Sequence, residues 1–220
     1  MRFFKENSES IIKLYINQIG IAIFAMFLYT AAGALSEKIT DSLAMKILIS
    51  VFSVAFYFVL VYNVAWEIGA KDKIRIDGKR ATSRMRGETD TTDADQDNSQ
   101  SANPYKKTEK KGILLGIFAN VPNFVIVGIS IILSALYIAT EAEVLKTIFA
   151  ILNFLFRFFL SMYLGVIQGM TASIADENTM FLIQTVLFFA FSALAAVITH
   201  VSYVLGLKDF RFFATPKAKK

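Results

Sequence analysis

The sequence of 220 residues has no cysteine, three prolines, one tryptophan and one histidine. Without cysteine it can form neither a disulfide nor a thiolate metal site. A single histidine supplies too few nitrogen ligands for a metal centre, so neither a metal nor another cofactor is expected. The sequence also has no Gly-rich phosphate loop, HExxH, GxSxG or paired-carboxylate motif. These are the motifs that would point to an enzyme class.

Charge is scarce as well, and what there is lies in blocks. Charged residues make up 19% of the chain and hydrophobic residues 55%, whereas soluble domains are about a quarter charged. Uncharged runs cover 14–36, 47–66, 112–140, 158–175 and 178–207. Four of them reach the roughly 20 residues that a bilayer core requires. We therefore predict an all-α, polytopic transmembrane bundle with four full spans and a fifth, amphipathic or re-entrant, helical segment.

The first of these runs is expected to stay in the protein as a span. It is too long for the core of a signal peptide, and Glu6 and Glu9 interrupt the basic region before it.

The net charge of +5 comes from basic residues that flank the hydrophobic runs. Such residues set membrane topology and contact anionic headgroups, so we do not expect a nucleic acid as partner. Three basic residues precede the first run, eleven lie in 70–112 and five follow the last run. By the positive-inside rule the N-terminus, 70–112 and the C-terminus are cytoplasmic, in contact with anionic lipids of a plasma membrane.

The insertion 145–170 does not fit this topology as a full span, because it would place the basic C-terminus outside. Its polar residues follow one helical stripe: Lys146, Asn153, Arg157, Ser161 and Gln168. A re-entrant hairpin or an interfacial helix accounts for the stripe. The alternative is a tilted full span with Arg157 buried against a carboxylate. On an interfacial helix, Arg157 would either extend its charged end to water or contact an anion or lipid headgroup.

Two hydrophobic runs end on the same pattern, a polar residue followed by an aromatic, a glycine and Lys-Asp. The first copy starts at Asn63 and the second at His200. The shared residues form an interface motif: Trp66, Gly69, Lys71 and Asp72, then Tyr203, Gly206, Lys208 and Asp209. The aromatics suit the headgroup level, glycine suits a left-handed residue past a helix end, and lysine complements the helix C-terminus. Either two helices that end at the cytoplasmic side have independently acquired the same residues, or a two-helix unit is duplicated.

Several polar residues fall at one membrane depth in this register. They lie about 6–10 Å inside the cytoplasmic boundary and are expected to point inward and meet. The candidate polar layer consists of Asn17, Asn63, Asn120, Asn123 and His200. Its members either hydrogen-bond between helices or line a small cavity open to the cytoplasm.

The pattern divides the chain into three parts: a first two-helix unit at 1–70, a cytoplasmic segment at 71–111, and a second membrane unit at 112–220 that contains the insertion. Asp77-Gly78 predicts a turn, so the basic stretch 71–86 is expected to be a hairpin on anionic lipid. The polar stretch 87–107 is expected to be a disordered linker. Two GxxxG patterns, Gly112/Gly116 and Gly165/Gly169, permit close helix approach or dimerisation.

Four stretches carry a family resemblance: Trp66–Asp72, Ala119–Phe124, Met162–Gly165 and Tyr203–Asp209. They resemble a family of small, uncharacterised integral membrane proteins of Gram-positive anaerobic bacteria. That resemblance implies a bacterial plasma membrane and no activity. We therefore expect a non-enzymatic accessory or regulatory membrane component, which could form homo- or hetero-oligomers. The alternative is a small-solute or ion transporter that uses a cytoplasm-facing polar cavity.

Overall fold

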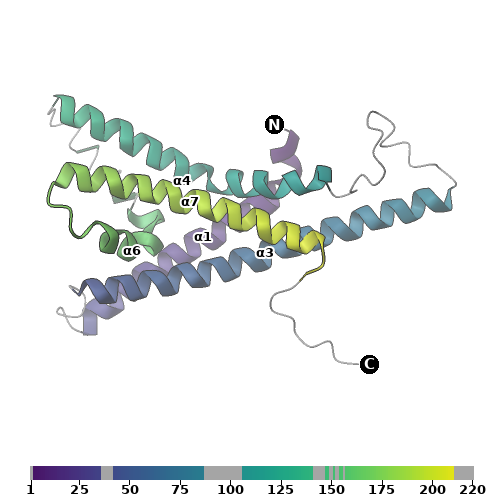
Figure 1. Ribbon diagram of the computed structural model, residues 1–220, viewed down its shortest axis with the longest axis horizontal. Coiled ribbons are helices and arrows are strands. Elements are labelled where there is room, and N and C mark those ends of the chain that lie inside the picture. The colour runs from purple at the N-terminus through teal and green to yellow at the C-terminus, as the bar shows by residue number, and fades with distance from the viewer. Residues whose placement is uncertain are drawn as a thin grey trace.

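The computed structural model describes residues 2–35, 42–86, 106–140, 147–148, 151, 154–155 and 157–210. Five helices make up most of this part of the chain: α1 (Arg2–Leu35), α3 (Leu43–Met85), α4 (Lys106–Thr140), α6 (Ser161–Thr171) and α7 (Glu177–Leu207). No strand occurs among these residues. α1, α3, α4 and α7 form a bundle of long, roughly aligned rods (Figure 1). The predicted helical bundle is confirmed.

The four long helices are also the four predicted spans. The helices over Phe3–Ala32, Leu43–Thr82, Thr108–Leu133 and Thr179–Leu207 each contain an 18-residue window that is apolar enough to cross a membrane. Many large apolar side chains on their outer faces are exposed, among them Phe27 at 67% and Ile132 at 61%. Exposed apolar surface of this extent is what a lipid-facing helix presents. The chain is a multi-pass membrane protein.

The bundle has one charged end. It comprises the N-termini of α1 and α4 and the C-terminal parts of α3 and α7, on the right of Figure 1. α3 and α7 therefore run in the same direction, and α1 and α4 run against them. α7 packs against α3, α4 and α6, and α1 packs against α3, α4 and α6. Buried aromatic and aliphatic side chains fill the centre, including Tyr57, Leu115, Tyr163 and Phe188.

The basic segment after the second span is a helix, so the predicted hairpin at 71–86 is wrong. α3 continues to Met85 and spans 43 residues, or about 64 Å at 1.5 Å per residue. Figure 1 shows its last part projecting beyond the other helices. Gly78 costs a helix only about 1 kcal/mol, and extending an existing helix needs no new nucleus. An Asp-Gly pair is a strong turn signal only between strands. Most of the predicted linker, 87–105, lies outside the described residues, and 106–107 begin α4.

The insertion enters the bundle only part of the way. Its helix breaks at Leu160, where φ is −110° and ψ is 15°, and resumes as α6, 11 residues long. Eleven residues cover about 16 Å, roughly half of a bilayer core. Ser161 Oγ donates to the carbonyl of Ala22 at 2.7 Å, near the middle of α1. Gln184, in the second turn of α7, donates to Thr171 Oγ1 at 3.0 Å. α6 therefore runs from mid-depth back to the end opposite the charged one, as the re-entrant alternative predicts.

A cluster of hydrogen-bonded polar groups holds α6 against α1 and α3. Ser50 Oγ lies 2.7 Å from the hydroxyl of Tyr29 and accepts the Gly165 amide at 2.7 Å. A Cβ on Gly165 would coincide with the Lys46 carbonyl, and one on Gly169 would press on Ile47. Of the two expected uses of this GxxxG pattern, the described contacts show close helix approach within the chain.

The stripe of polar residues predicted for the insertion does not share one face. Ser161 is buried and Gln168 half-buried, whereas Arg157 is exposed. Lys146 and Asn153 lie outside the described residues. The tilted span with a buried Arg157 is therefore wrong. The change of direction at Leu160 separates Arg157 from the helix that carries Ser161.

Candidate functional site

The predicted polar layer assembles only in part. Asn120 and Asn123 are buried on α4, where Asn123 Nδ2 donates to Asn120 Oδ1 at 3.1 Å. Asn120 Nδ2 donates to the Gly116 carbonyl at 2.9 Å. Asn63 is exposed, while Asn17 and His200 are half-buried. The expectation that all these residues point inward is wrong, because equal depth does not imply an equal helix face.

The helix faces themselves show which polar residues are buried. On α1 the buried positions recur every three or four residues: Ile11, Leu14, Gln18, Ile21 and Ala25. On α3 they are Ser50, Ser53, Tyr57, Val61, Ala65, Gly69 and Asp72. Gln18 and Asp72 belong to these stripes, whereas Asn17 and Asn63 do not. The sequence therefore contained the signal that identifies Gln18 and Asp72 as the inward polar residues.

Asp72 is the centre of the charged end. Its side chain is 9% exposed, and Lys111 Nζ of α4 lies 2.7 Å from its Oδ2. The Tyr203 hydroxyl of α7 donates to the same oxygen at 2.7 Å. Arg75, one turn further along α3, lies 3.2 Å from Oδ1. One carboxylate thus connects three helices, and two cations and a hydroxyl compensate for its burial.

α1 joins this arrangement at its outer rim. Lys13 Nζ lies 3.6 Å from Glu67 of α3, and Lys71 lies 2.7 Å from the same carboxylate. These side chains are about half exposed or more, so the pairs contribute little to stability. They place both signs of charge around the buried Asp72.

The two copies of the interface motif pack directly against each other. A Cβ on Gly69 would lie 2.1 Å from the carbonyl oxygen of Tyr203, and a Cβ on Gly206 would lie 2.2 Å from that of Trp66, so both would overlap the facing backbone. Each glycine therefore packs against the backbone of the aromatic residue of the other copy, which is Tyr203 for Gly69 and Trp66 for Gly206. Only glycine permits this approach, because any side chain would separate α3 from α7. The contact is reciprocal, residue for residue.

The predicted role of these glycines at helix ends is wrong. Gly69 lies inside α3 and Gly206 in the last turn of α7. The left-handed residue is Asp209, with φ of 57°. It follows Lys208, which caps α7 through its amide, bonded to the carbonyl of Val204.

The aromatics of the motif also cross between the copies. Trp66 Nε1 donates to the carbonyl of Phe210 at 2.8 Å, as Tyr203 reaches Asp72 in the other direction. Lys73 Nζ lies 3.7 Å from Asp209, which is exposed. The two Lys-Asp pairs thus differ, since Asp72 is buried and Asp209 is not.

A second glycine pair, Gly112 and Gly116, allows α4 to pack closely against α7. A Cβ on Gly112 would press on Tyr203 and His200, and one on Gly116 would press on the backbone of Ala196. His200 Nδ1 and Asn123 Oδ1 are buried without a hydrogen-bond partner among the described residues. This GxxxG pattern therefore brings two helices of one chain together.

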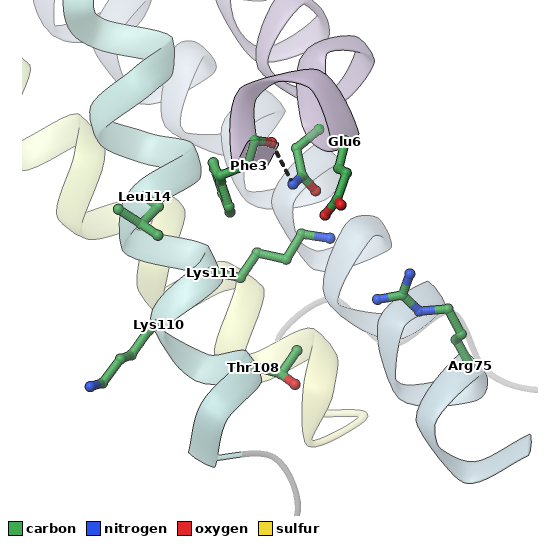
Figure 2. A pocket seen from close by; sticks show the side chains of 8 residues that line it. Phe3, Glu6, Arg75, Thr108, Lys110, Lys111 and Leu114 are labelled. Atoms are coloured by element: carbon green, nitrogen blue, oxygen red, sulfur yellow. Dashed lines mark hydrogen bonds between the residues drawn. The ribbon is translucent and has the colours of Figure 1, made fainter. Parts of the chain in front are cut away.

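Two cavities flank Asp72 at the charged end. The larger, about 470 Å³, lies between α1, α3 and α4. It is lined by Phe3, Glu6, Asn7, Arg75, Thr108, Lys110, Lys111 and Leu114 (Figure 2). The second, about 250 Å³, is lined mainly by α1 and α3, with Asp72 and Lys111 in its wall. Neither is lined by Asn63 or His200.

The chemistry available at this site is ionic. Within the part of the chain that the structure describes, no group of three side chains suited to a metal ion occurs. The Asp72 carboxylate is occupied by Lys111, Arg75 and Tyr203, an arrangement that holds charge in place. Comparison with protein-family models, curated proteins and solved structures found no match to this chain. The site must be interpreted from its own geometry.

Proposed function

We propose that this protein is a non-enzymatic accessory or regulatory component of the plasma membrane. Its N-terminus, the α3–α4 connection and its C-terminus lie in the cytoplasm, and its charged end contacts anionic lipids. The observation that carries the proposal is the way charge is distributed. Lys111, Arg75 and Tyr203 surround Asp72 at one end of the bundle, and the basic end of α3 projects from there.

The interior of the bundle supports a structural rather than a catalytic role. Gly69, Gly116 and Gly206 bring backbones into direct contact, and such close packing leaves little room for a substrate. Some polar groups in the interior bond within their own helix, as Asn120 and Thr199 do to carbonyls one turn earlier. Exposed Lys71, Arg75 and Lys79 on the far part of α3 suit a cytoplasmic partner or surface of opposite charge.

The same proposal includes an internal repeat. The reciprocal contacts of Gly69 with Tyr203 and of Gly206 with Trp66 support a duplicated unit whose second helices, α3 and α7, pack side by side. Convergence on a shared helix ending does not by itself require the two endings to face each other. A duplication accounts for both the shared pattern and the reciprocal contact.

Site-specific photo-crosslinking in native membranes tests the proposal. A photoreactive residue is placed at Lys79, on the projecting part of α3, and at Phe27, on the exposed apolar face of α1. A regulatory component gives discrete protein adducts from Lys79, whereas Phe27 gives lipid adducts. If Lys79 yields no protein adduct while the chain is intact and inserted, the proposal fails.

One observation favours a transporter as the second candidate. α6 is a half-length helix that begins at mid-depth, next to α1 and α7, and broken or partial helices line substrate sites in many transporters. Proteoliposomes containing the purified chain test this by ion flux under an imposed potential. Flux that exceeds protein-free vesicles and disappears in a Gly165→Leu variant would favour the transporter over the accessory role.

A further inference from the structure

The cavity of about 470 Å³ between α1, α3 and α4 is lined by residues that suit a phosphate. Three basic side chains line it, Arg75, Lys110 and Lys111, against one acidic side chain, Glu6. Figure 2 shows the ends of Arg75 and Lys111 directed into the same space, with Glu6 opposite Lys111 and Lys110 directed outward. Lys111 is held by Asp72 at 2.7 Å. Arg75 is therefore the cation inside the cavity that an incoming anion meets, and Lys110 lies at its outer rim.

Arg75 keeps hydrogen-bonding capacity for a ligand. Its side chain is 63% exposed, and its Nη2 lies 3.2 Å from Oδ1 of Asp72. A guanidinium has five N–H donors in a planar fork that matches two oxygens of a phosphate. The contact with Asp72 thus fixes the position of the guanidinium and leaves further donors for a second anion.

α4 begins at the edge of the same cavity. Its first residue is Lys106, and Thr108 and Lys110 in its opening turns line the cavity. The first four amides of a helix have no partner within the helix, and the helix dipole adds positive potential there. Together with Arg75 and Lys110, this end of a 35-residue helix favours a bound phosphate.

The level of the cavity along the bundle matches a lipid headgroup. Its apolar wall is formed by Phe3 and Leu114, and Phe3 stacks on Phe118 with ring centroids 5.6 Å apart. The uncharged runs of α1 and α4 begin at Leu14 and Gly112, directly after the charged residues of this end. Basic side chains are therefore next to water and apolar side chains are next to the membrane core, as the two parts of a phospholipid require.

We propose that this cavity binds the phosphate of an anionic phospholipid through Arg75, with Lys110 at the outer rim of the cavity and Lys111 as the fixed charge beside Asp72. The inference deepens the proposed function, because it rests on the contact with anionic lipid and names its site. A soluble phosphate has the same chemistry, so the experiment separates the two sources.

The test measures lipid retained by the full-length chain in mixed micelles, by native mass spectrometry. Phosphatidylglycerol is titrated into phosphatidylcholine micelles for the wild type, for Arg75→Gln/Lys110→Gln, and for Arg80→Gln/Arg86→Gln. The third protein loses the same charge from the same end of the bundle, at residues that do not line the cavity. We expect the apparent Kd for phosphatidylglycerol to rise about tenfold in the cavity pair and less than about twofold in the control pair.

Equal losses in the two pairs would overturn the site, because diffuse attraction to a basic surface depends only on net charge. Inorganic phosphate forms the second arm. If phosphate at millimolar concentration leaves phosphatidylglycerol retention unchanged, the ligand is the lipid. If phosphate binds through the same residues and phosphatidylglycerol does not, the lipid assignment is overturned. Failure of either arm leaves the crosslinking result at Lys79 unaffected, so it can be told apart from failure of the proposed function.

Discussion

Asp72 illustrates what a buried carboxylate requires at the residue scale. Taking a charge out of water is costly unless a counter-charge and hydrogen bonds replace the solvent. Lys111 and Tyr203 supply these from two other helices, each at 2.7 Å. The side chain of Lys111 is itself only 18% exposed, so each member of the pair needs the other as its counter-charge.

Asp72→Asn is expected to destabilise the protein by about 2 kcal/mol. The substitution keeps a hydrogen-bond acceptor for Tyr203 but leaves Lys111 with no counter-charge at that position. Unfolding in increasing dodecyl sulfate can be followed by Trp66, the single tryptophan, whose indole bonds next to the site.

Asp77→Asn is the matched control for that experiment. It removes the same charge from an exposed position of the same helix and should change stability by less than about 0.5 kcal/mol. The double variant Asp72→Asn/Lys111→Gln should lose clearly less than the sum of its single variants, because the two residues act through each other. Additive losses, or equal stability of the two Asn variants, would contradict the coupling.

Sequence reasoning did not predict the helix face on which each polar residue lies. Counting residues from the boundary puts Asn63 in the polar layer and Asp72 in the interface motif, but it does not give the face of α3 on which either residue lies. Only the periodicity of burial along α3, with positions such as Tyr57 and Val61, separates them. Tyr203 as a partner of Asp72 could not be predicted, because it depends on which helices are neighbours.

At the scale of the elements, glycine decides which helices touch. Gly69 and Gly206 admit the facing backbone, whereas a Cβ added at Gly20 or Gly128 would have nothing within 4 Å. The same residue type therefore has opposite consequences at different places in this bundle.

Gly69→Ala is expected to destabilise the protein by at least about 2 kcal/mol. The added methyl would overlap the Tyr203 carbonyl, so α3 and α7 would have to separate and lose packing along their length. The dodecyl sulfate titration with Trp66 fluorescence measures the loss.

Gly128→Ala is the control for Gly69→Ala. It places the same methyl in open space on α4 and should be neutral or about 0.5–1 kcal/mol stabilising, through the better helix propensity of alanine. The same stability for both variants would show that α3 and α7 do not pack through Gly69.

Gly78→Ala distinguishes the helix from the hairpin that the sequence suggested. In the projecting part of α3, alanine should stabilise the local helix by about 1 kcal/mol, which slows amide exchange there about fivefold. Hydrogen exchange of 74–86 in the full-length chain measures this. Ala81→Gly, one turn later, should accelerate exchange by a similar factor. Faster exchange in Gly78→Ala would indicate a left-handed glycine and contradict the continuous helix.

The limits of sequence reasoning differ between elements. The four spans follow directly from uncharged runs, since nothing else in a chain of this kind needs so many apolar residues in sequence. The helix after Trp66 was missed because its charge and its Asp77-Gly78 pair resemble a loop. Charge ends the membrane span there, but it does not end the helix.

At the scale of the whole molecule, the insertion determines how the chain is threaded. If residues 145–170 crossed the membrane, α4 and α7 would end and start on opposite sides. Because α6 covers only about 16 Å and returns toward the end at which α4 finishes, the start of α7 lies at the same end as the start of α3. This parallel arrangement is also what allows Gly69 and Gly206 to meet.

Single-cysteine labelling tests this threading, and the absence of native cysteine makes every introduced thiol the only one. Ser42→Cys precedes α3 and Ser173→Cys follows α6, and both positions are exposed. A membrane-impermeant maleimide should label both from the same side of intact cells. Thr82→Cys, exposed on the projecting part of α3, should be labelled only after permeabilisation if that part is cytoplasmic. Labelling of Ser42→Cys and Ser173→Cys from opposite sides would contradict the re-entrant path, whereas labelling of Thr82→Cys in intact cells would invert the proposed orientation and leave the fold unchanged.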